Sequence, residues 1–195
     1  MLAVLVLVCA SAGVWLAREV DSSAPRLTSG TWLPRARALG EFSLTDQNGA
    51  AFTAARLEGA PTLVFFGFTH CPDVCPLTLL QLAKVKQSGV VPHLRVLFIT
   101  VDPARDTPVL LAQYVHAFDP DIIGATGTPA TLAEVTRAFG VAYERVELPG
   151  GDYTMDHSAT VFLLDAHGRN VAVFSPPFDV QALTADLKRA AGRLG

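Results

Sequence analysis

The stretch Gly67-Phe68-Thr69-His70-Cys71-Pro72-Asp73-Val74-Cys75-Pro76 decides how this chain folds. It follows the apolar run 61–66, which is typical of a buried strand. It precedes residues 77–86, whose leucines and valine recur at helical spacing. The two cysteines therefore sit at a turn between a strand and a helix. Pro76 fits the first helical position, which places Cys75 near the N-cap, where the helix dipole favours the reactive thiolate.

Two nearby cysteines could also form a structural disulfide or pack as small apolar residues in the core. A disulfide stabilises a fold more when it closes a long loop than when it closes a very short one. Core cysteines would not require a turn framed by Pro72 and Pro76. The pair therefore indicates redox or metal chemistry, which a CxxxC spacing permits in any compartment.

The composition indicates one folded domain without a nucleic-acid surface. The chain has 195 residues, of which 50% are hydrophobic, so it can build an ample core of its own. The net charge is −3 and the sequence contains no basic block, which argues against nucleic-acid binding. The third cysteine, Cys9, lies in the apolar N-terminus.

Residues 1–17 carry no charged side chain and are followed by Arg18-Glu19. At about 1.5 Å per residue, the run is slightly short for a membrane core of about 30 Å. Trp15 nevertheless sits where an interfacial aromatic residue would. A cleaved signal is the alternative, because Ala10-Ser11-Ala12 matches the small-x-small cleavage pattern. We expect a single-span anchor or a signal segment, and in both cases a domain outside the cytoplasm.

Residues 18–38 are predicted to form a linker, because they are rich in Ser, Pro, Arg and Thr and lack an apolar period. Residues 39–195 are predicted to form the domain. A hairpin, β-α-β-α-β-α alternation, a second hairpin and a closing helix predict an α/β fold with a mixed sheet flanked by helices. The predicted strands are 42–45, 51–53, 62–68, 94–101, 121–124, 158–164 and 170–174, and residues 141–146 are predicted to be extended. The predicted helices are 76–88, 108–118, 129–139 and 180–194. Strand 62–68 should lie parallel to 94–101, with 158–164 antiparallel in the same sheet.

A second polar segment, Tyr153-Thr154-Met155-Asp156-His157-Ser158, precedes a predicted buried strand. His157 stands out among the five histidines because it lies in a predicted loop beside Asp156. On the residues alone, a structural histidine is still favoured over a ligand. Asp102 and Arg105 follow strand 94–101 at the sheet edge where α/β sites collect, although a structural turn is the preferred interpretation.

Three motifs follow one another along the chain: Gly67-Phe68-Thr69-x-Cys71-Pro72-Asp73-x-Cys75-Pro76, Val101-Asp102-Pro103-x-Arg105-Asp106-Thr107 and Asp156-His157-Ser158. They occur in the order found in the Sco/SenC family, and from Leu39 to the C-terminus the chain closely resembles that family. The resemblance implies a thioredoxin-like domain with an N-terminal hairpin, anchored to the inner membrane and lying in the periplasm.

The resemblance also implies that Cys71, Cys75 and His157 bind one copper, and that the chain assists assembly of the binuclear copper site of cytochrome c oxidase. The implied partners are the copper-site subunit of the oxidase or another copper chaperone. Thiolates select Cu(I), imidazole suits Cu(I) and Cu(II), and three ligands leave a position open for transfer. Asp156 is a candidate for orienting the imidazole, and His70 is a less favoured spare ligand.

The leading hypothesis is a copper metallochaperone, which is a binding and transfer protein rather than an enzyme. The alternative is a thiol–disulfide oxidoreductase, in which Cys71 and Cys75 form a redox-active pair that reduces the cysteines of the copper site or of other extracytoplasmic proteins. A peroxidase is the third hypothesis, because Thr69-His70-Cys71 superficially resembles a peroxiredoxin turn. His157 discriminates between these readings, since only a copper site needs it.

Overall fold

The computed structural model describes residues 24–195. The predicted anchor or signal segment, 1–17, lies outside the described residues and stays a prediction. In the described part of the chain, no helix is both long and apolar enough to cross a membrane.

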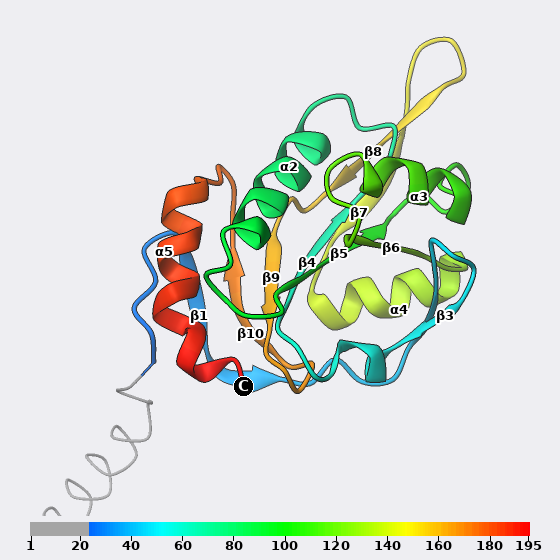
Figure 1. Ribbon diagram of the computed structural model, residues 1–195. Coiled ribbons are helices and arrows are strands. Elements are labelled where there is room, and N and C mark those ends of the chain that lie inside the picture. The colour runs from blue at the N-terminus through cyan, green and yellow to red at the C-terminus, as the bar shows by residue number, and fades with distance from the viewer. Residues whose placement is uncertain (1–23) are drawn as a thin grey trace, which may run out of the picture.

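The domain is built on a mixed sheet of eight strands in the order β1-β10-β9-β4-β5-β6-β2-β3, with a separate two-stranded sheet, β7-β8 (Figure 1). The strands are β1 (Gly30–Arg37), β2 (Ser43–Asp46), β3 (Ala51–Thr53), β4 (Thr62–Gly67), β5 (Arg95–Thr100), β6 (Ile123–Thr126), β7 (Tyr143–Glu147), β8 (Tyr153–His157), β9 (Val161–Leu164) and β10 (Asn170–Phe174). The α-helices are α2 (Val74–Gln87), α3 (Pro108–His116), α4 (Pro129–Phe139) and α5 (Val180–Ala190), and the short 3-10 helices are η1 (Ala54–Leu57) and η2 (Ala191–Arg193).

The centre of the sheet confirms the predicted pairing. β4 runs parallel to β5 and antiparallel to β9. β10 continues the sheet beyond β9, and α2 and α5 lie side by side (Figure 1). β2 and β3 form the expected N-terminal hairpin. This arrangement is the mixed, helix-flanked sheet that the resemblance predicts.

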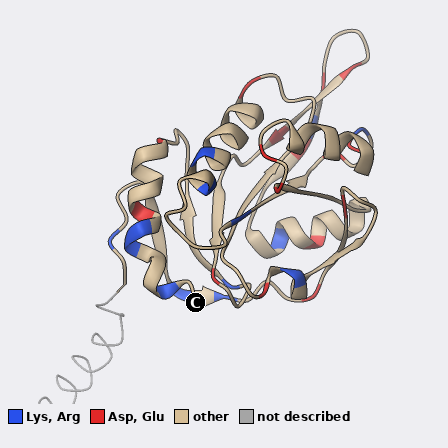
Figure 2. Cartoon of the chain, in the orientation of Figure 1, with Lys and Arg blue, Asp and Glu red and all other residues tan. Residues whose placement is uncertain are grey.

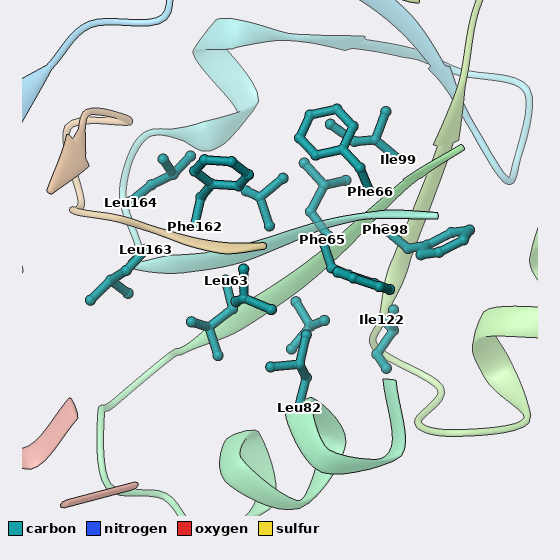
Figure 3. Packing of buried hydrophobic residues seen from close by; sticks show 14 of the residues in the cluster. Leu63, Phe65, Phe66, Leu82, Phe98, Ile99, Ile122, Phe162, Leu163 and Leu164 are labelled. Atoms are coloured by element: carbon teal, nitrogen blue, oxygen red, sulfur yellow. The ribbon is translucent and has the colours of Figure 1, made fainter. Parts of the chain in front are cut away.

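The buried side chains of β4 alternate between the two faces of the sheet, as a strand requires. Phe65 points toward α2 together with Phe98 of β5, and Leu82 of α2 packs on the same side (Figure 3). The Phe65 and Phe98 ring centroids are 6.1 Å apart. Burying each such ring stabilises the fold by about 1.5–3 kcal/mol.

Phe66 points to the opposite face, where α4 covers the sheet. Its ring centroid lies 5.1 Å from that of Phe139 on α4 and 6.0 Å from that of Phe162 on β9. Thr128 caps α4 by accepting a hydrogen bond from the backbone of Thr131, and Gly140 ends the helix in the left-handed conformation. Both helix ends of α4 are therefore as the sequence predicts.

The helix after the cysteine turn starts earlier than predicted. α2 begins at Val74, with Asp73 at the N-cap, so that Cys75 and Pro76 lie in its first turn. A proline is tolerated there because the first backbone N–H groups of a helix have no partner within the helix. Cys75 still lies at the positive end of the helix dipole.

Part of the predicted linker 18–38 is a strand of the main sheet. β1 pairs antiparallel with β10, with an irregular register between Trp32 and Arg37. Its residues from Pro34 to Arg37 are exposed, and an edge strand with a proline has no clean apolar alternation to detect. The domain therefore begins before residue 39.

The predicted loop 153–158 is also a strand over most of its length. β8 pairs with β7, and His157 stands opposite Tyr143. The buried strand that follows starts at Val161 instead of Ser158. β7 agrees with the predicted extended segment 141–146. β8 was missed because none of its residues is fully buried, so its sequence has no apolar alternation.

We expect the start of the domain to depend on Asp186 of α5. This carboxylate is buried and accepts hydrogen bonds from the backbone N–H and hydroxyl groups of Thr28 and Ser29. Asp186→Ala leaves these donors unpaired, so the free energy of unfolding should fall by about 3 kcal/mol in urea titrations. Asp179→Ala is the matched control on the same helix, and loss of that N-cap should cost only about 1 kcal/mol. Equal losses would contradict this role.

The same carboxylate predicts a loss of stability in acid. Burial alone would raise the pKa of Asp186, but the hydrogen bonds from Ser29 and Thr28 outweigh it and hold the pKa below its usual value. The stabilisation is therefore complete above the unfolded pKa of about 3.9 and is lost as pH falls through the lower folded pKa. In Asp186→Ala this part of the acid dependence should disappear.

Candidate metal centre

The two cysteines lie at the carboxyl end of β4, on either side of the start of α2. Cys71 is partly exposed in the turn, whereas Cys75 is fully buried in the first turn of the helix. Both are free thiols. The backbone N–H of Cys75 donates a hydrogen bond of 3.4 Å to the Cys71 sulfur. The turn thus holds the two sulfurs on one side of the helix end.

Gly67 makes room for the buried sulfur. A Cβ atom at this position would stand 2.9 Å from Cys75 Sγ and 2.7 Å from the Phe98 ring. Both distances are shorter than real Cβ contacts, so any side chain here would displace the sulfur or the ring. The last residue of β4 is therefore a glycine for reasons of space.

The two thiols have opposite acidities. The hydrogen bond from the Cys75 thiol lowers the pKa of Cys71 to about 5. Burial raises this pKa, and hydrogen bonds from the backbone N–H groups of Cys75 and Asp73 lower it further. The same interaction, together with burial, raises the pKa of Cys75. The prediction that the helix dipole favours a thiolate at Cys75 is therefore wrong, and the anion lies on Cys71 instead. At neutral pH the pair therefore carries one negative charge. Cys71 is the thiolate, and Cys75 keeps its proton and donates it in the hydrogen bond to Cys71.

His157, at the end of β8, brings an imidazole to this pair from 82 residues along the chain. Its Nε2 atom lies 3.4 Å from Cys75 Sγ. Its Nδ1 atom lies 3.2 Å from the carbonyl oxygen of Ser158. Because a carbonyl can only accept, Nδ1 carries a proton, and Nε2 is the ring nitrogen that faces the sulfur and is placed to bind a metal. Phe65 and Phe68 flank the imidazole edge-on, at centroid distances of 6.2 and 5.9 Å.

The structure thus brings together the three residues that the resemblance implied as ligands. Within residues 24–195, no three His, Cys, Asp or Glu side chains are close enough to hold a metal ion as they stand, so the ligands would have to close by a small movement. The donor set nevertheless fits a soft metal, because it offers a thiolate, a second thiol and an imidazole lone pair. A pocket of about 350 Å³ opens beside His157 and is lined by residues of the β7-β8 hairpin and its flanks.

The surroundings of the site favour a cation. Its exposed charged residues are mostly acidic, whereas Lys and Arg gather around the C-terminal half of α5 and on β1 (Figure 2). Such an asymmetry raises the local concentration of positive ions. The exposed acidic residues of the cysteine turn and the β7-β8 hairpin are Asp73, Glu144, Glu147, Asp152 and Asp156.

A buried carboxyl group fixes the cysteine turn. Asp106 accepts hydrogen bonds from the backbone N–H of Thr69 at 3.0 Å and from the hydroxyl groups of Thr69 and Thr100, each at 2.5 Å. Burial raises the pKa of Asp106 above its usual value. In the sequence, Asp106 stands out only as part of a motif, because nothing local connects it to a turn 37 residues away.

The other residues considered from the sequence have different roles. Asp102 and Arg105 form the expected turn through a hydrogen bond from Arg105 Nε, and Asp102 also accepts one from the Tyr153 hydroxyl at 2.8 Å. Asp156 is exposed, and the Ser158 carbonyl orients the imidazole in its place. His70 lies half exposed with Nδ1 at 3.1 Å from Thr69 Oγ1, and within residues 24–195 it contacts neither sulfur.

Several solved structures share this fold. Bradyrhizobium japonicum ScoI with copper bound is 44% identical, with a TM-score of 0.69 over 77% of this chain and 97% of its own. Arabidopsis thaliana ScoI with copper bound is 37% identical, with a TM-score of 0.74 over 79% of this chain and 98% of its own. Apo Sco1 from Thermus thermophilus is 34% identical, with a TM-score of 0.73 over 86% of this chain and 96% of its own.

Relatives by sequence agree with the structural neighbours. A SCO2-like protein of Rickettsia conorii is 40% identical over 139 residues, which cover 69% of this chain and 68% of that protein. The mitochondrial SCO2 homolog of Bos taurus is 36% identical over 184 residues, which cover 91% of this chain and 69% of that protein. The profile of SCO1/SenC proteins matches residues 32–192. The chain therefore belongs to the SCO1/SenC family.

Proposed function

We propose that this chain binds one copper ion through Cys71, Cys75 and His157 and delivers it during assembly of the binuclear copper site of cytochrome c oxidase. The observation that carries the proposal is the 3.4 Å approach of His157 Nε2 to Cys75 Sγ, with Nδ1 turned away toward the Ser158 carbonyl. A protein that only exchanges disulfides has no need of this imidazole. Two relatives, at 44% and 37% identity, are solved with copper bound.

The donor chemistry supports cargo copper better than structural zinc. Thiolates select Cu(I), and a structural zinc site usually has four protein ligands. Cys71 is already ionised at neutral pH, because its pKa is lowered to about 5. Cys75 must lose its proton when it binds the metal. Three ligands leave a position through which an incoming partner ligand can take the ion.

A second candidate function follows from the exposure of Cys71. Its thiolate can attack a disulfide of the partner, which forms a mixed disulfide and releases one partner thiolate. Cys75, after losing its proton, then attacks the Cys71 sulfur. This step closes the Cys71–Cys75 disulfide and releases the second partner thiolate, so that two electrons pass to the partner. The oxidase subunit with its copper-site cysteines would be the substrate.

We further propose that residues 1–17 tether the domain to the inner membrane on its periplasmic side. The segment has no charged side chain and is followed by Arg18-Glu19. If it is an anchor, alkaline extraction should leave the full-length protein in the membrane pellet. Release of a shortened protein that begins at Gly13 would show that the segment is a cleaved signal.

Reduced protein should bind one Cu(I) per chain in competition with a chromophoric chelator. Cys71→Ser and Cys75→Ser should abolish tight binding, because each removes a thiolate ligand. His157→Ala should weaken binding and change the Cu(II) absorption spectrum. His70→Ala is the matched control, since that imidazole contacts neither sulfur, and it should leave both unchanged.

Copper loading of the oxidase in cells separates the two candidate functions. Transfer of copper requires all three ligands, so the two cysteine variants and His157→Ala should all lose loading. Normal loading in His157→Ala, beside lost loading in the cysteine variants, would favour the reductase.

Alkylation of the metal-free protein tests the unequal acidities. The rate of reaction of Cys71 with iodoacetamide should rise with pH through about 5, because the thiolate is the nucleophile. Cys75→Ala removes the hydrogen bond from the second thiol, so the midpoint should move toward the ordinary thiol pKa of about 8.5. A midpoint near this ordinary value in the unaltered protein would contradict the assignment.

A further inference from the structure

The β7-β8 hairpin, which carries His157, stands apart from the main sheet. Among residues 24–195 the two strands pair only with each other, from Tyr143 opposite His157 to Glu147 opposite Tyr153. Backbone pairing with the main sheet therefore does not set the position of the imidazole relative to the cysteines. Residues 158–160 join His157 to β9 of the main sheet, so side-chain contacts must set the tilt of the hairpin about this connection.

Several of these contacts surround Tyr153, at the other end of β8. Its hydroxyl donates a hydrogen bond of 2.8 Å to Asp102. The guanidinium carbons of Arg105 and Arg145 each lie 3.7 Å from the centre of its ring. Two guanidinium groups cannot share one ring face at that distance, so the ring lies between them, in two cation–π contacts.

Arg105 joins the ring to the backbone. Its Nη1 atom donates a hydrogen bond of 3.0 Å to the carbonyl oxygen of Tyr153, and its Nε atom donates one to Asp102. The start of β8 is therefore attached to the 101–107 loop through the hydroxyl, the ring and the main chain of Tyr153.

Fixing Tyr153 also affects the orientation of His157, because both residues lie on one strand. Residues 153, 155 and 157 share one face of β8, because side chains alternate along a strand. Four steps of about 3.3 Å separate Tyr153 from His157 by about 13 Å. A small change of tilt at the anchored end therefore displaces the imidazole at the other end.

The loop that holds Tyr153 also holds the cysteines. Asp106, four residues after Asp102, accepts the hydrogen bonds that fix Thr69 in the cysteine turn. Thr100 links the two ends of the loop, since its hydroxyl donates to Asp106 and accepts from the backbone N–H of Asp102. One loop thus provides a common support for both parts of the candidate site.

We propose that Asp102, Arg105, Arg145 and Tyr153 form a clamp that positions His157 against Cys75 and so sets how firmly the site retains copper. The proposal rests on the proposed copper function and deepens it. Tyr153 is a positioning residue, because it does not touch the metal ligands. The clamp acts only through the hairpin, which gives it a distinct experimental signature.

Tyr153→Phe in the full-length, copper-loaded protein removes the hydrogen bond to Asp102 and keeps the ring. Copper dissociation should become about tenfold faster, the loss expected for one hydrogen bond to a charged partner, and the Cu(II) absorption spectrum should shift. In a His157→Ala background the same substitution should have no further effect. An equal effect in both backgrounds, or none in either, would overturn the clamp.

Tyr143→Phe is the matched control. Tyr143 faces His157 across the same hairpin, and its hydroxyl makes no hydrogen bond within residues 24–195, so the dissociation rate should not change. Arg145→Gln is a second, milder variant, because the Arg145 side chain is half exposed and its loss leaves Asp102 and Arg105 in place. It should accelerate dissociation about threefold, the low end for one cation–π contact.

Metal-free protein gives a readout that is independent of copper. In Tyr153→Phe, amide hydrogen exchange should accelerate in β7 and β8 and remain unchanged in β4 and β5. Unchanged exchange in the hairpin would reject the clamp. If the unaltered chain binds no copper, the proposed function fails, and this exchange experiment still decides whether the clamp holds the hairpin.

Discussion

The parallel pairing of β4 with β5 is the constraint on which the candidate site depends. It places the carboxyl ends of both strands at one edge of the sheet, where Val101 N–H bonds to the Gly67 carbonyl at 2.8 Å. The cysteine turn leaves β4 at that edge, and the 101–107 loop leaves β5 beside it. Asp106 can reach Thr69 only because the two segments start side by side. Without this register, neither the cysteines nor the His157 hairpin would have its support.

The chemistry of the pair follows from placing two thiols close together in a largely buried turn. Two thiolates there would repel each other and lose hydration, so only one ionises. The helix end and the hydrogen bond from Cys75 select Cys71 as the anion. In the proposed function, binding of copper replaces the Cys75 proton and release of copper restores it. Protons and copper thus compete for the same sulfur, which makes the binding reversible.

The elements that the sequence predicts well are those with strong local signals. β4 and β5 are apolar runs, and α4 begins after a Thr-Pro pair and ends at Gly140. β1 and β8 lack such signals, because many of their side chains are exposed or half-buried. They are strands because they pair with a neighbouring strand, and the sequence of the segment alone does not show that pairing.

The candidate site shows the same division. The two cysteines are conspicuous in the sequence, whereas His157 could be assigned only through the family resemblance, since 82 residues separate it from Cys75. The role of Tyr153 was missed, although it stands in the polar segment that drew attention to His157. The available signal was the segment Asp102–Asp106, in which three of five residues are charged. So many charged groups in one loop indicate hydrogen bonds to residues far away in the sequence, but they do not show which residues these are.

A site divided between a rigid turn and a separate hairpin suits a protein that must give up its ligand. Cys75 is fully buried and is fixed by β4 and α2. His157 is half-buried beside an open pocket of about 350 Å³, on a hairpin whose strands do not pair with the main sheet. The free energy needed to move the imidazole is therefore smaller than that needed to move the buried sulfur. A partner that approaches from the pocket meets His157 first, which is the metal-binding residue that moves most easily. The strength with which the hairpin is attached at Tyr153 then decides how easily His157 moves.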